Sequence, residues 1–117
     1  MSVNKDIGVD SLLALNGSRF FVDDKGDLEA VFKIKRIAIS PGRPHGLKYS
    51  LVLLSAKGDR IICFDNAHAF SQGTGPGKKH SKIYDHKHIG KRVTPYLFID
   101  AHTLVADFWA EVDKLIQ

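Results

Sequence analysis

The chain has 117 residues, a formal net charge of +4, 44% hydrophobic residues and a single cysteine. A chain of this length suits one domain and can bury roughly two-thirds of the surface that it exposes when unfolded. One cysteine excludes an internal disulfide, and no apolar run approaches the length of about 18 residues that a membrane span requires. The polar first residues also lack a secretory pattern. We therefore expect a single cytoplasmic domain over residues 1–117, with no membrane partner and no cofactor.

The first half of the chain predicts a short helix and two β-hairpins. Residues 10–16 end in Asn-Gly, which favours a helix stopped by a left-handed glycine. Residues 18–23 and 28–39 are rich in β-branched and aromatic side chains, and the turn sequence "DKGD" separates them. Residues 47–55 and 60–66 repeat this arrangement around "AKGD".

The two hairpins differ in the pattern of their apolar residues. In the first hairpin Phe32 and Ile34 alternate with lysines, which predicts one solvent-exposed face. The alternation slips after Lys35, as it would at a β-bulge. In the second hairpin both alternating sets are apolar, which predicts central strands covered on both faces.

The C-terminal residues predict an amphipathic helix that covers the sheet. Apolar side chains recur at helical spacing from Leu104 to Ile116, and Asp100 can cap the first turn. The predicted fold is therefore α+β, an antiparallel meander sheet of about four strands packed by this helix. The helix could pack within the monomer or partly across a homodimer, and we favour the first arrangement.

Basic residues gather between the second hairpin and the final helix. Residues 67–82 are rich in Gly, Ser and Lys without periodicity, which predicts a long loop that either moves over a site or hangs free. The local excess of positive charge favours RNA or another polyanion, although a solvated loop has the same composition. The candidate nucleic-acid-binding residues are Lys78, Lys79, Lys82, Lys87, Lys91 and Arg92.

The stretch "YDHKH" in this basic segment concentrates groups that can transfer protons. If it is extended, Tyr84, His86 and His88 lie on one face, and Asp85 and Lys87 lie on the other. Two imidazoles then converge, as they would in a metal-independent ribonuclease with one histidine as base and the other as acid. The candidate catalytic residues are His86, His88, Asp65, His68, Asp85 and Tyr84.

In this first hypothesis, Lys87 and Arg92 stabilise the charge on the phosphate, and Asp65 and Asp85 hold an imidazole in its useful tautomer. In a second hypothesis, the basic segment binds nucleic acid or an acidic partner and no bond is broken. In a third, a metal-dependent nuclease or hydrolase uses a ligand set of carboxylate and imidazole groups. The four candidate metal ligands are Asp65, His68, His86 and His88.

A plainer interpretation remains open, in which these histidines are merely exposed or bonded to backbone. We assign this role to His45, in a turn rich in Pro and Gly, and to His102, in the first turn of the final helix. The interpretation is less satisfactory for the "FDNAH" and "YDHKH" segments, because several titratable groups at a strand end are typical of a functional site.

The motifs "HGLKYSLVL", "FDNAH", "YDHKH" and "PYLFIDAHTLVADFWAEVDKLI", in this order, resemble the TumE family of small bacterial toxins from type II toxin–antitoxin pairs. The resemblance covers roughly residues 45–116. It implies a bacterial cytoplasmic protein encoded beside an antitoxin with a helix-turn-helix DNA-binding domain, which neutralises the toxin by direct contact.

The resemblance does not by itself assign catalytic roles. The positions that match the family's motifs are Asp65, Asn66, His68, Tyr84, Asp85, His86 and His88. A sheet of hairpins with one helix against it is also similar to toxin ribonucleases that cut messenger RNA. Fold alone does not establish the reaction.

Overall fold

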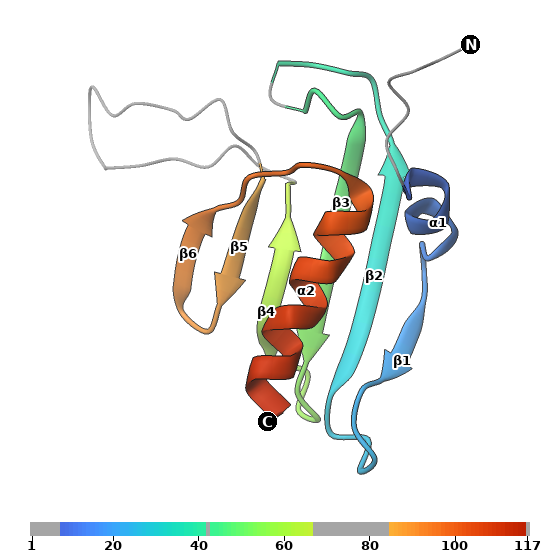
Figure 1. The fold of residues 1–117 in the computed structure, drawn as a ribbon. Helices are drawn as coiled ribbons and strands as arrows, with labels where there is room; N and C mark the ends of the chain where they lie inside the picture. The colour runs from blue at the N-terminus through green and yellow to red at the C-terminus, as the bar shows by residue number, and fades with distance from the viewer. Residues whose placement is uncertain (1–7, 42, 67–84, 117) are drawn as a thin grey trace.

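The computed structural model describes residues 8–41, 43–66 and 85–116. Within these ranges the chain forms two helices and a six-stranded antiparallel sheet in which each strand pairs with the next in the sequence. The elements are α1 (Val9–Ala14), β1 (Arg19–Phe21), β2 (Glu29–Arg36), β3 (Leu47–Leu54), β4 (Arg60–Asp65), β5 (His86–Ile89), β6 (Arg92–Pro95) and α2 (Ala101–Ile116). Figure 1 shows α2 lying across one face of the sheet, with α1 beside one end of β2.

The sequence predicts the α+β class, both helices and strands β1 to β4, but the prediction of about four strands is wrong. The two further strands, β5 and β6, have four residues each, "HKHI" and "RVTP". Neither shows the alternation of apolar and polar side chains that reveals a half-buried strand. They form a hairpin around Gly90 and Lys91, with a positive φ of 61° at Gly90, and β5 pairs with β4.

The β-bulge predicted after Lys35 is also absent. β2 keeps an uninterrupted register with β3 as far as Arg36, where the strand ends. The irregularity lies between β3 and β4 instead, where the register shifts at Leu53 and Leu54 and Arg60 pairs with Leu54. The bulge therefore lies in the second hairpin.

The hydrophobic core lies between the sheet and α2. The ring of Phe108 in α2 meets the ring of Phe32 edge-on, with 5.2 Å between centroids, and the Trp109 ring lies 5.6 Å from that of Phe20. Phe32, Phe64 and Phe108 are fully buried. The helix thus packs within its own chain, as predicted. In the described part of the chain, no helix is long and apolar enough to cross a membrane.

The first turn of α2 has the predicted cap. The Asp100 Oδ1 accepts a hydrogen bond from the Thr103 N–H at 2.7 Å, and this bond lowers the pKa of Asp100.

Both helices that the structure describes lie on the same side of the sheet. The prediction that β3 and β4 are central strands is confirmed. No described helix covers their second face, where Val52 is only half-buried.

Buried polar side chains fix the ends of β4 and β5. The Asn66 Oδ1 accepts from the Tyr49 N–H at 2.9 Å, and its Nδ2 donates to the Leu47 carbonyl at 2.7 Å. The buried Asp85 carboxylate accepts from the Tyr49 hydroxyl at 2.7 Å and pairs with His45 Nε2 at 2.9 Å. Because the Leu47 N–H donates to Nδ1 of His45, the proton of this imidazole lies on Nε2. Asp85 therefore ties the start of β5 to β3.

We predict that Tyr49→Phe destabilises the protein by about 1–3 kcal/mol, because it leaves the buried Asp85 carboxylate with one donor fewer. Burial and the Asp85 charge raise the pKa of Tyr49, so its hydroxyl stays protonated and donates. Urea unfolding followed by circular dichroism measures the loss. The control is Tyr96→Phe, which removes a hydroxyl bonded to the half-buried Asp107 and should cost less. Equal losses would contradict the role assigned to Asp85.

Candidate functional site

The two histidines of β5 lie together on the sheet face opposite α2. His86 pairs with Asp65 of β4, and His88 pairs with Cys63, so the four side chains share one face. The ring centroids of His86 and His88 are 4.9 Å apart. The prediction that these imidazoles converge is confirmed. Asp85 faces the other way, as the alternation of an extended strand requires.

A carboxylate orients the first of these imidazoles. The Asp65 Oδ1 lies 2.8 Å from His86 Nε2, and both side chains are largely buried. The other oxygen, Oδ2, accepts a hydrogen bond from the Cys63 thiol at 3.1 Å. A carboxylate at this distance fixes the ring orientation of His86. Of the two predicted partners, Asp65 therefore contacts a site histidine, while Asp85 contacts His45.

The surroundings of the second imidazole favour its neutral form. His88 is partly exposed, and its pKa lies below the usual range because burial disfavours the charge, with further contributions from His86 and Arg60. Burial and the Asp65 charge raise the pKa of the neighbouring Cys63 thiol to about 12. Cys63 is thus a protonated donor at neutral pH, not a nucleophile.

Arg60 is a site residue that sequence reasoning misses. Its Nη1 lies 4.0 Å from the Cys63 sulfur, on the histidine face. Simple alternation back from Cys63 would place residue 60 on the α2 side. The bulge between β3 and β4 adds one residue to β4 and turns Arg60 to the face of its partner Leu54. The pattern of the sequence carries no signal for this register shift.

Three of the predicted nucleic-acid-binding residues lie away from this site. Lys87 faces α2, where its Nζ lies 3.5 Å from Glu111 Oε2 and 5.9 Å from the centroid of the Phe64 ring. Lys91 lies in the turn between β5 and β6, and Arg92 is exposed on the edge strand β6. None of these three cations is brought to the histidine pair.

The other predicted site residues lie outside the described residues, as does the expected loop over 67–82. These site residues are His68, Tyr84, Lys78, Lys79 and Lys82.

The site also groups atoms that a metal ion could bind. One ligand atom from each of Asp65, His86 and His88 lies within 4.8 Å of the other two. Carboxylate and imidazole suit several divalent transition metals. The fourth ligand of the metal hypothesis, His68, lies outside the described residues.

The comparisons with known proteins point to one family. No curated protein and no solved structure matches the chain. The family model described as Toxin TumE matches residues 13–116, so the match includes the first hairpin as well as the histidine segment. Such a toxin acts as one component of a toxin–antitoxin system and has a cognate antitoxin as partner. The chain belongs to the TumE toxin family.

Proposed function

We propose that this toxin cleaves RNA without a bound metal, with His88 as general base and His86 as general acid. The observation that carries the proposal is the arrangement of the two imidazoles, 4.9 Å apart, with Asp65 paired to one of them. A base must be neutral at the working pH, and burial lowers the pKa of His88, which suits this role. His86 takes the complementary role of acid, and Asp65 fixes the orientation of its ring.

The proposed reaction needs only these two proton transfers. His88 takes the proton of a ribose 2′-hydroxyl, and the 2′-oxygen attacks the adjacent phosphorus. The bond from phosphorus to the 5′-oxygen breaks, and His86 gives that oxygen a proton. The products are a 2′,3′-cyclic phosphate and a 5′-hydroxyl end.

Two neighbouring side chains support the proposed reaction. Asp65 is a positioning residue that orients His86. Arg60 lies on the same face and can stabilise the charge that develops on the phosphate oxygens. It takes the role predicted for Lys87 and Arg92, because Lys87 faces α2 and Arg92 is exposed on the edge strand β6. The proposal also includes a type II pair in the bacterial cytoplasm, with a protein antitoxin that carries a helix-turn-helix domain.

We predict that His86→Ala/His88→Ala abolishes growth arrest in a bacterial host and RNA cleavage by the purified protein. Loss of one general acid or base typically costs about 10²–10⁴-fold in rate. Soluble protein levels must be matched, and the control is His102→Ala, an exposed histidine on α2 that should leave both activities intact. Equal arrest by wild type and double variant would contradict the assignment and favour toxic binding without cleavage.

We also predict that the acidic limb of the pH profile of kcat/KM lies below the ordinary histidine pKa of about 6.5. The reason is that the lowered pKa of His88 keeps the base neutral to lower pH. Arg60→Gln removes a neighbouring positive charge, so it raises the pKa of His88 and moves this limb to higher pH. Lys57→Gln, an exposed change in the turn before β4, is the control and should not move it.

A metal-dependent nuclease is the second candidate, favoured by the three convergent ligand atoms of Asp65, His86 and His88. Purified wild type and the double histidine variant can be compared by elemental analysis and by cleavage in the presence of a chelator. Full activity in chelator would remove this candidate. Stoichiometric metal that is lost in the double variant, with cleavage that stops in chelator, would replace the metal-independent mechanism.

A further inference from the structure

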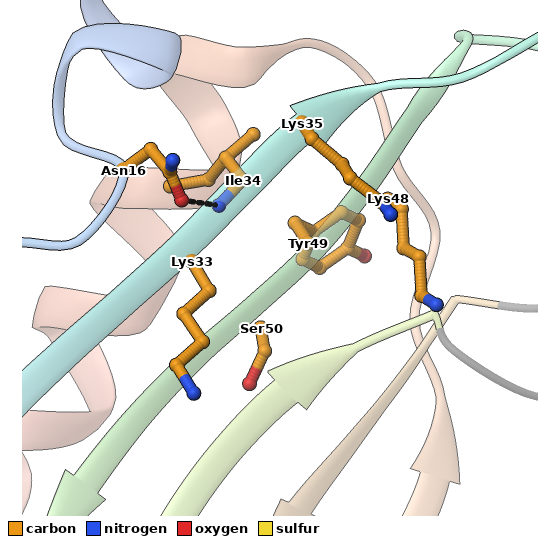
Figure 2. A pocket seen from close by; sticks show the side chains of 7 residues that line it. All are labelled: Asn16, Lys33, Ile34, Lys35, Lys48, Tyr49 and Ser50. Atoms are coloured by element: carbon orange, nitrogen blue, oxygen red, sulfur yellow. Dashed lines mark hydrogen bonds between the residues drawn. The ribbon is translucent and has the colours of Figure 1, made fainter.

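A pocket lies on the same sheet as the histidine pair, two strands away from β5. Its volume is about 350 Å³, and it spans β2 and β3 (Figure 2). Two of its lining residues are joined by a hydrogen bond, in which the Asn16 side chain accepts from the Ile34 N–H at 2.9 Å. The lining residues are Asn16, Lys33, Ile34, Lys35, Lys48, Tyr49 and Ser50.

Three lysines give this pocket a concentrated positive charge. Lys33, Lys35 and Lys48 are exposed, and none of the seven lining residues is acidic. Lys35 and Lys48 are direct partners in the β2–β3 register, and Figure 2 shows them side by side. Like charges directly opposite each other destabilise a sheet. Among the described residues no ion pair involves any of the three lysines, although Arg19 and Arg36 nearby on β1 and β2 each have one.

The pocket and the histidine pair share one face of the sheet. The register runs from Lys33 to Ser50, from Ser50 to Asp65 and from Asp65 to His86, so these side chains form one row across four strands. Ser50 lines the pocket and is the direct partner of the carboxylate that holds His86. Three strand spacings separate Lys33 from His86, which is about 14 Å.

We propose that these three lysines, Lys33, Lys35 and Lys48, form a lysine subsite that binds phosphate groups of the same RNA strand that is cut at His86 and His88. This inference rests on the proposed ribonuclease function and adds the path of its substrate. A distance of about 14 Å corresponds to roughly four nucleotides of a stacked strand. Cations at both ends of one continuous face, Arg60 and the lysine subsite, suit an extended polyanion better than a single small anion.

The first test is RNA binding by Lys35→Gln/Lys48→Gln, in the His86→Ala/His88→Ala background so that the probe is not cut. The probe is a fluorescent oligouridylate of about 12 nucleotides, read by anisotropy from about 50 to 200 mM salt. We expect the dissociation constant for the RNA to rise about tenfold, because each exposed ion pair contributes only a modest binding energy. The slope of log K against log salt concentration should become smaller in magnitude by about 1.4, because two phosphate contacts are lost. Lys25→Gln/Lys57→Gln removes the same charge from exposed turns and is the matched control.

The second test separates the subsite from the chemistry, in the protein with both histidines present. A dinucleotide that occupies only the histidine pair cannot reach Lys35 or Lys48. Lys35→Gln/Lys48→Gln should therefore cleave the dinucleotide as wild type does, while KM for the long oligouridylate rises about tenfold with kcat unchanged. Melting curves of the variants verify that the exposed substitutions leave the fold intact.

The remaining outcomes overturn the inference in distinct ways. Equal weakening by the Lys25/Lys57 control would reduce the effect to overall charge. Unchanged binding by Lys35→Gln/Lys48→Gln would place the RNA elsewhere and leave the ribonuclease proposal standing. Slower dinucleotide cleavage would mean that the lysines act at the reacting phosphate. A wild-type protein that neither binds nor cuts RNA would overturn the proposed function and this inference with it.

Discussion

The Asp85 carboxylate is a buried charge, and burying a charge is costly unless donors surround it. Its donors, the Tyr49 hydroxyl and His45 Nε2, lie on the α2 side of the sheet. This pairing turns residue 85 toward the core at the start of β5. Because successive side chains of a strand alternate, His86 and His88 must then face away from α2. The position of one structural carboxylate thus decides on which face the imidazoles meet.

The acidic residues of the "FDNAH" and "YDHKH" motifs therefore have different physical roles. Asp85 is held in the core between β3 and β5, whereas Asp65 contacts His86 on the opposite face. Asn66, the residue after Asp65, is buried and satisfies backbone groups of β3. The "FDN" and "YDH" segments each combine one residue that fixes the strands with one that belongs to the site. Loss of activity in an Asp85 variant would consequently report on the fold.

Local patterns predict much of this molecule. Alternation and turn sequences predict β1 to β4, helical spacing predicts α2, and alternation alone predicts that His86 and His88 share a face. The same alternation places Lys87 on the opposite face. The prediction that Lys87 stabilises the charge on the phosphate is therefore inconsistent with the predicted strand. β5 and β6 carry no apolar pattern and depend on pairing with β4, which is a long-range interaction. Arg60 reaches the site through a register shift that no local pattern encodes.

The two faces of the sheet are built under different constraints. The space between the sheet and α2 is filled by apolar side chains such as Phe32, Phe64 and Phe108, which are fully buried and closely packed. The other face keeps features that cost stability, namely a β-bulge beside Arg60 and the directly opposed Lys35 and Lys48. Departures of this kind from local rules are expected where function requires them. On this face a single row of paired residues runs from Lys33 in the pocket to His86, so the proposed RNA binding and cleavage would depend on the same strand register.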